Sequence, residues 1–225
     1  MKAKLGMVTI GQAPRVDVVP DMAELLGPSV EIVERGALDG LTTQHIATLA
    51  PTSDDEILVT RLADGQSVFV AKRHVTPLVQ QKIQALEADD VAMTVLLCTG
   101  KFPPLDARRP LIEPDKILLG VIRGIKFSRR LGVLTPSERH VAQTEARWTA
   151  YGFAEPVVIA ASPYHESASI PHAAAAFKAR GAGLVVLDCI GFRREARVAL
   201  QEALGVPVIV ANLLVARVVA ELLGV

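Results

Sequence analysis

Two apolar runs that each lead to a cysteine constrain the fold more than any other feature of the sequence. Residues 184–187 lead through Asp188 to Cys189, and residues 91–97 lead directly to Cys98. A continuous apolar run of this length is typical of a strand buried on both faces, as in a parallel sheet covered by helices. Ligands of such sheets bind at the carboxyl ends of the strands. The sequence therefore predicts that both thiols lie at a ligand-binding edge.

The segments around these runs alternate between strand and helix patterns, which indicates an α/β protein. Strands are expected at residues 5–10, 30–34, 131–135 and 157–161, and helices at residues 18–26, 76–88, 137–151 and 169–179. A hairpin interrupts the alternation, because Asp64-Gly65 lies between the apolar, β-branched runs 57–62 and 67–71. We expect this inserted β-hairpin to be peripheral to the core.

A weak internal repeat predicts two like domains. The pattern Leu-Gly-x-x-Thr occurs at residues 5–9 and again at 131–135, and each copy opens a β/α run that ends in a cysteine. Two pseudo-symmetric α/β domains that face each other across a cleft are therefore expected, each a mostly parallel sheet flanked by helices. We assign residues 1–112 and 206–225 to the first domain and residues 113–205 to the second.

Composition argues against nucleic-acid partners and against a disulfide-rich secreted protein. Lys plus Arg and Asp plus Glu number 24 each, so no net charge attracts a polyanion, and the chain has only six Phe, two Tyr and one Trp for base stacking. Two cysteines do not form a disulfide framework, which favours a cytoplasmic location. The composition is compatible with a homo-oligomer as well as with a monomer.

The C-terminal segment from Val206 is apolar enough to raise the question of a membrane span. It contains Pro207, Asn212, Arg217 and Glu221, and charges in the middle of a bilayer are costly. A buried strand at 207–211 followed by a helix that Asn212 caps explains the same residues. We therefore expect no membrane partner.

The two thiols suit proton transfer at carbon. If Cys98 and Cys189 face each other across a cleft, one can remove a proton from one face of a carbon atom while the other returns a proton to the opposite face. The alternative is that both are small buried hydrophobic residues. The residues His165, Glu166 and His172 match no zinc spacing, and no phosphate- or dinucleotide-binding glycine pattern occurs. No cofactor or metal is expected.

Other residues at the predicted strand ends suit a small carboxylate. Thr9, Thr99 and Thr135 offer hydroxyl groups, and the adjoining loops offer backbone N–H groups beside helix N-termini. Arg15 and Lys101 could add a positive charge, although Arg15 could equally pair with Asp17.

Asp188 has two interpretations. It could hold its loop or tune the neighbouring thiol of Cys189. The structural role is favoured, because neighbouring residues on a strand point to opposite faces.

Four segments of the chain closely resemble the AroM family, and the match covers essentially the whole sequence. These segments are residues 9–17, 36–41, 187–192 and 212–217. The family name implies only an association with aromatic amino-acid biosynthesis genes. The family is similar, more distantly, to the aspartate/glutamate racemase superfamily. That resemblance implies two pseudo-symmetric α/β domains, a catalytic cysteine from each domain, and no cofactor.

The resemblance places Cys98 and Cys189 at the two catalytic thiol positions, with Thr99 as the hydroxyl residue after the first. The substrate-binding candidates from the resemblance and the loops together are Thr9, Gly11, Gln12, Arg15, Thr99, Gly100, Thr135, Ile190 and Gly191. The chain departs from the superfamily pattern at Ile190 and Gly191, where Thr and often His are usual, and it lacks the Asn expected near the first cysteine. These departures count against amino-acid racemisation.

Two functional hypotheses follow. The first is a cofactor-independent isomerase, racemase or lyase that moves a proton on a small carboxylate with Cys98 and Cys189. The second is a non-catalytic metabolite-binding or regulatory protein that keeps a racemase-like cleft.

Overall fold

The computed structural model describes residues 3–52, 56–164 and 166–225, so His165 lies outside the described residues. The chain forms two compact units, Met1–Asp115 with Val215–Val225, and Lys116–Leu214. The division after residue 214 differs from the expected one after residue 205. The reason is that the strand β10 (Val208–Val210) pairs with β9 (Ala182–Leu187) in the sheet of the second unit.

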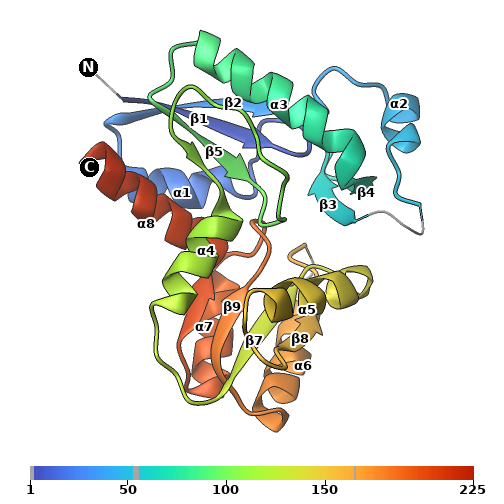
Figure 1. The fold of residues 1–225 in the computed structure, drawn as a ribbon, viewed down its shortest axis with the longest axis vertical. Helices are drawn as coiled ribbons and strands as arrows, with labels where there is room; N and C mark the ends of the chain where they lie inside the picture. The colour runs from blue at the N-terminus through green and yellow to red at the C-terminus, as the bar shows by residue number, and fades with distance from the viewer. Residues whose placement is uncertain (1–2, 53–55, 165) are drawn as a thin grey trace. The chain divides into compact units, whose positions relative to one another are not determined.

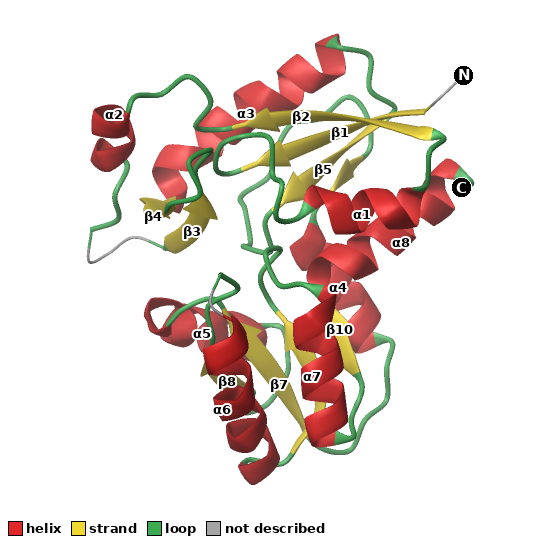
Figure 2. Cartoon of the chain, turned by 180° about the vertical axis from the view of Figure 1, so that it is seen from behind, coloured by secondary structure: helices red, strands yellow, loops and turns green. Residues whose placement is uncertain are grey.

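The first unit is a four-stranded parallel sheet with helices on both faces. Its strands run in the order β2-β1-β5-β6. Helix α3 covers one face, and α1 with the end of α8 (Ala211–Leu223) covers the other (Figures 1 and 2). The elements are β1 (Ala3–Thr9), α1 (Val19–Leu26), β2 (Val30–Gly36), α2 (Thr43–Thr48), β3 (Ile57–Arg61), β4 (Ser67–Ala71), α3 (Lys72–Ala88), β5 (Met93–Leu97) and β6 (Leu111–Ile112).

The second unit has the same architecture. Its parallel strands run in the order β10-β9-β7-β8. Helices α6 and α7 pack together on one face of the sheet, and α5 lies on the other (Figure 2). The remaining elements are α4 (Pro114–Arg123), β7 (Arg130–Thr135), the 3₁₀ turn η1 (Glu138–His140), α5 (Val141–Ala150), β8 (Val157–Ala160), α6 (Glu166–Ala179) and α7 (Arg194–Leu204). The predicted fold class is confirmed.

Sheet register shows how closely the two units correspond. In the first unit β1 lies beside β5, and Thr9 is level with Leu97. In the second unit β7 lies beside β9, and Leu134 is level with Leu187. One residue further on, the level of Thr135 is that of Asp188. Cys98 therefore follows the residue level with Thr9, and Cys189 follows the residue level with Thr135. These two threonines end the opening strands of the two units.

The glycine of the repeated Leu-Gly-x-x-Thr pattern allows a helix to approach the opening strand. A Cβ atom at Gly6 would lie 3.1 Å from Leu86 Cδ1 of α3, and one at Gly132 would lie 3.0 Å from the Phe177 ring of α6. Both distances are shorter than ordinary van der Waals contact, so a side chain at either glycine would push the helix outward. The repeat thus encodes close helix–strand packing in both units.

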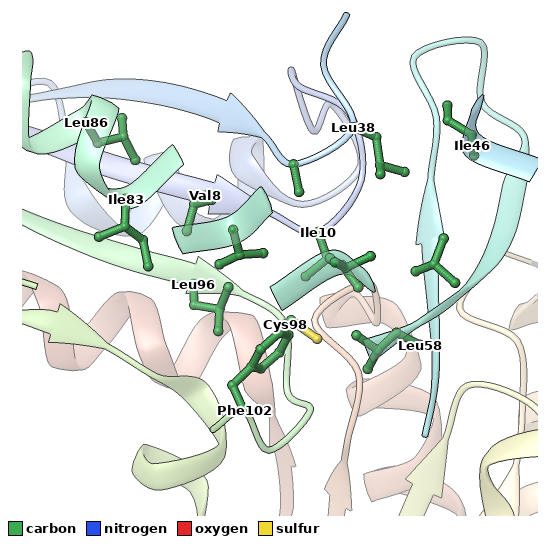
Figure 3. Packing of buried hydrophobic residues seen from close by; sticks show 14 of the residues in the cluster. Val8, Ile10, Leu38, Ile46, Leu58, Ile83, Leu86, Leu96, Cys98 and Phe102 are labelled. Carbon is green, nitrogen blue, oxygen red and sulfur yellow. The ribbon is translucent and has the colours of Figure 1, made fainter. Parts of the chain in front are cut away.

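The hairpin β3–β4 is present and antiparallel, as predicted, but its expected position outside the core is wrong. Leu58 and Val70 belong to the buried cluster that also contains Val8, Leu96 and Cys98 (Figure 3). Alternate residues of β3 are buried, because one face of the hairpin packs against the rest of the first unit. The exposed residues of the hairpin are those of the turn, 63–66, and the adjoining Ser67.

Asn212 does not cap the last helix. Helix α8 begins at Ala211, and the Asn212 side-chain amide donates a hydrogen bond to the carbonyl oxygen of Phe192 at 2.9 Å. Its Oδ1 atom is buried and accepts no hydrogen bond from any described residue. In the part of the chain that the structure describes, no helix has the length and apolar character needed to cross a membrane.

Candidate functional site

The end of the opening strand in the first unit is organised by a buried arginine. Arg15 is 3% exposed, and its Nη1 donates to Thr9 Oγ1 at 3.0 Å. Its Nε and Nη2 donate to the two carboxylate oxygens of Asp17 at 2.8 and 2.9 Å. The pairing with Asp17 that the sequence left open is therefore present. A role for Arg15 in gripping a ligand carboxylate stays a prediction.

Asp17 is held as a carboxylate by this arrangement. Burial alone would raise its pKa, but the hydrogen bond and the charge of Arg15, helped by the charge of Arg61, hold the pKa of Asp17 below its ordinary value. Arg61 Nη1 lies 3.9 Å from Asp17 Oδ2. The hairpin strand β3 thus adds a second positive charge to the loop after β1.

The candidates Gly11 and Gln12 shape this loop. Gln12 Oε1 accepts a hydrogen bond from Ala63 N at 2.9 Å, and Gln12 Nε2 donates to Leu38 O at 3.3 Å. A Cβ atom at Gly11 would overlap Thr60 Oγ1 and the carbonyl oxygen of Arg61, so only glycine fits there. Both ends of the Gln12 amide therefore bind protein, and its contact with a substrate remains a prediction.

Sequence reasoning gave no role to Asp39, which joins the loops after β1 and β2. Its Oδ1 accepts from Ala13 N at 2.9 Å, and its Oδ2 accepts from Gly36 N at 2.6 Å. The sequence does carry a general signal, because Asp in a glycine-containing loop often hydrogen-bonds nearby backbone groups and stabilises a turn.

Cys98 follows β5 and is 8% exposed. Its sulfur accepts a hydrogen bond from Gly100 N at 3.4 Å, and an N–H donor favours the charged form of a thiol. The side chain lies beside Phe102 in the apolar cluster (Figure 3). Thr99 is also buried, with 6% of its surface exposed.

Cys189 opens a tight turn after β9 and is likewise 8% exposed. Phe192 N donates to Cys189 O at 3.3 Å, and the Asn212 amide holds the Phe192 carbonyl. Within the turn, Ile190 is buried and Gly191 lies against Pro163 and Tyr164. The turn is thus fixed from the strand, from the helix α8 and from the loop after β8.

Asp188 lies under this turn with a completely buried side chain. Its Oδ2 accepts from Trp148 Nε1 at 2.8 Å and forms an ion pair with Arg147. Both partners come from α5, and sequence reasoning missed them. Thr135, at the end of β7, shares a 3.0 Å hydrogen bond with Thr144 of the same helix.

The predicted residues therefore gather at the strand ends of each unit separately. Thr9, Gly11 and Arg15 follow β1, and Cys98, Thr99 and Gly100 follow the neighbouring β5. In the second unit, Thr135 ends β7, and Cys189, Ile190 and Gly191 follow the neighbouring β9. Neither cysteine is part of a disulfide. Among the described residues, no three His, Cys, Asp or Glu side chains group so as to hold a metal ion.

Solved structures with the same fold include isomerases and a decarboxylase. Allantoin racemase from Klebsiella pneumoniae has 16% identity and a TM-score of 0.66, over 99% of this chain and 88% of that one. An unliganded arylmalonate decarboxylase has 14% identity and a TM-score of 0.63, over 99% and 93%. The maleate isomerase Iso from Pseudomonas putida S16 has 13% identity and a TM-score of 0.63, over 100% and 94%. At these identities the likeness shows the fold.

No curated protein matches the sequence. The family model described as AroM protein matches residues 5–223. Because this match spans nearly the whole chain, the protein belongs to the AroM family.

Proposed function

We propose that the protein is a racemase-type isomerase, or a lyase, that transfers a proton at a carbon atom of a small carboxylate without a cofactor. Cys98 and Cys189 are the proposed acid and base. The observation that carries this proposal is the sheet register, which gives the only two cysteines of the chain equivalent positions in the two units. If the two cysteines were only small buried residues, nothing would require them to occupy equivalent positions in the two units.

The chemistry follows from what two thiols can do. One thiolate removes the proton next to the carboxylate, so a C–H bond breaks, an S–H bond forms and the electron pair remains on the substrate as an enolate-like anion. The other thiol then gives its proton to the same carbon. Return to the opposite face gives inversion, and protonation after loss of CO₂ gives the decarboxylase variant. The proposal requires both sulfur atoms to reach one substrate.

Hydroxyl and backbone N–H groups are proposed to stabilise the developing negative charge. Thr9 Oγ1 already accepts hydrogen bonds from Arg15 and from Gly11 N. A hydroxyl has one donor and two acceptor sites, so the Thr9 proton is left to donate to a further acceptor, which we propose a substrate carboxylate supplies. Thr99, Gly100, Thr135, Ile190 and Gly191 complete the proposed binding set.

The allantoin racemase, arylmalonate decarboxylase and maleate isomerase that share the fold support this class of reaction. Their different substrates leave the substrate of this protein open. The departures at Ile190 and Gly191 from the racemase pattern favour a carboxylate other than an amino acid.

Exchange of hydrogen at carbon tests the proposal directly. The protein is incubated in deuterated water with a panel of small carboxylates, and NMR detects deuterium at carbon. One or more substrates should exchange, and both Cys98→Ser and Cys189→Ser should slow the exchange by roughly 10²-fold or more. Val198→Ala, at an exposed position of α7, is the matched control and should exchange normally.

The alternative, a metabolite-binding protein without chemistry, predicts a different result from the same panel. A carboxylate would then bind in calorimetry but show no exchange, and both serine variants would keep that affinity. Exchange that survives replacement of both cysteines would contradict the proposed mechanism.

A further inference from the structure

The residues that precede the two cysteines are equivalent in position and opposite in character. Leu97 is level with Thr9 in the first unit, and the register of β7 and β9 gives Asp188 the same level in the second. Both are buried, at 1% and 3% exposure. A buried apolar residue is therefore sufficient at this position of the fold, and the second unit holds a carboxylate there instead.

The ion pair of Asp188 does not explain that choice. A buried salt bridge is often no more stabilising than apolar residues of similar volume, and Leu97 shows that an apolar residue fits the equivalent position. Arg147 and Trp148 both bind Oδ2. The other carboxylate oxygen, Oδ1, is buried and has no hydrogen-bond partner among the described residues.

The partners that the structure shows for the Asp188 side chain therefore all contact one of its two carboxylate oxygens. The Arg147 side chain is 15% exposed whereas that of Asp188 is fully buried, so water screens the cation more than the anion. The other groups around the turn are Tyr164 in the loop after β8 and Arg193 before α7. Asn212, from α8, is uncharged and binds the Phe192 carbonyl.

A buried anion next to a thiol disfavours a second negative charge there. Cys189 is the residue after Asp188 in the chain, both are buried, and charges interact more strongly where water is excluded. Cys98 has the apolar Leu97 at the corresponding place. The two thiols are thus equivalent in the scaffold but unequal in electrostatics.

We infer that Asp188 keeps Cys189 protonated while Cys98 is the thiolate, so that Asp188 is a positioning residue that assigns the acid and base roles. The inference rests on the proposed function for those roles, but the state of each thiol is measurable without a substrate. It develops the second interpretation of Asp188, the tuning of the neighbouring thiol, while the structural role that the sequence favoured stays a prediction.

Alkylation by iodoacetamide across a pH series, followed by mass spectrometry of each cysteine peptide, tests the inference. The pH midpoint of reaction reports ionisation, and the maximal rate reports access. In the unaltered protein the midpoint of Cys98 should lie below that of Cys189. Asp188→Asn should lower the Cys189 midpoint by about one pH unit or more, and Arg147→Gln should raise it. The Cys98 midpoint should stay constant in both variants.

Asp64→Asn in the exposed hairpin turn is the matched control and should move neither midpoint. Equal midpoints in the unaltered protein, or an unchanged Cys189 midpoint in folded Asp188→Asn, would overturn the inference. If either variant fails to fold by circular dichroism, the two midpoints of the unaltered protein decide. Deuterium exchange can succeed or fail independently, so a failure here is distinguishable from a failure of the proposed function.

Discussion

The two units share a scaffold but hold their strand ends by different means. In the first unit a loop-internal pair, Arg15 and Asp17, fixes Thr9, and the hairpin packs against the same loop. In the second unit a buried carboxylate beneath the cysteine turn binds α5, and the threonine pairs with a second threonine. Strand order, register and the Leu-Gly-x-x-Thr pattern are repeated, whereas the polar networks are not.

This difference separates what the fold requires from what each site adds. Features present in both units, such as the close approach at Gly6 and Gly132, serve the scaffold. Features found in one unit, such as Asp188 or the hairpin, are additions that the scaffold tolerates. Exchanging residues between equivalent positions tests that division.

The largest effect is expected from breaking the ion pair of the second unit. Arg147→Met leaves the buried Asp188 carboxylate without its cation, which should lower the free energy of unfolding by about 3 kcal/mol. Two further substitutions should recover most of the loss. Asp188→Leu places at this position the apolar residue found in the first unit, and Trp148→Phe removes the indole N–H that would otherwise lose its acceptor. Urea denaturation measures the loss and the recovery. A triple variant as unstable as Arg147→Met would show that the fold itself needs the charges.

The next effect concerns the hairpin β3–β4 of the first unit. Gly11 corresponds to Ser137 through the repeat, and the described residues of the second unit contain no hairpin against Ser137. Gly11→Ser should lower the free energy of unfolding by about 1–3 kcal/mol because its Cβ meets Thr60 and Arg61. The reciprocal Ser137→Gly should cost less. Similar losses in both variants would argue against hairpin crowding as the cause.

Arg15→Lys sharpens the comparison at the arginine of the first unit. Lysine keeps the charge but loses the planar fork that binds Asp17 and Thr9 together, so the free energy of unfolding should fall by about 1–2 kcal/mol. The sequence-based prediction is that affinity for the carboxylate found by exchange also falls, by roughly 1–3 kcal/mol. Thermal melts measure the loss of stability, and calorimetry measures the loss of affinity. An unchanged affinity would show that Arg15 has a structural role only.

Acid should weaken the first unit through Asp17. Its pKa is lowered in the folded state, so its stabilising contribution is complete above the unfolded pKa near 4 and is lost as the pH falls through the lower folded value. The melting temperature of Asp17→Asn should therefore fall less than that of the unaltered protein between about pH 5 and pH 2. Parallel pH curves for the two proteins would contradict this assignment.

The smallest effect is expected at the tip of the hairpin. Two glycines inserted between Asp64 and Gly65 should change the free energy of unfolding by less than about 1 kcal/mol, because lengthening an exposed loop has a small entropic cost. Leu58→Ala, in the buried part of the hairpin, is the contrast and should cost several times more. A melting temperature that falls by tens of degrees on insertion would refute this expectation.

Local signals in the sequence predicted most of the fold. Apolar runs, the Asp-Gly turn and the repeated Leu-Gly-x-x-Thr pattern each act within a few residues, and they located the strands, the hairpin and the pseudo-symmetry. The Arg15–Asp17 pair could be considered because its members are two residues apart. Asp188 and Arg147 are 41 residues apart, so no local pattern joins them.

The errors have the same origin. The buried face of the hairpin depends on a surface formed by β1, α3 and β5, which the hairpin sequence does not specify. Asn is a common helix-capping residue, but helix α8 begins one residue earlier, at Ala211, and the Asn212 side-chain amide donates to the distant carbonyl of Phe192. The expected placement of residues 206–214 with the first unit differs from the observed division because the pairing of β10 with β9 is a contact between separate segments.

The bonds at the base of the hairpin suggest a use in protein engineering. Gln12 connects the loop after β1 to this hairpin through the Arg61 carbonyl and the Ala63 amide, while the turn between β3 and β4 is exposed. A circularly permuted fluorescent domain inserted at Asp64–Gly65 would be coupled mechanically to the loop that carries Arg15. Such a fusion would act as a biosensor, whose change in emission could identify ligands before any reaction is known.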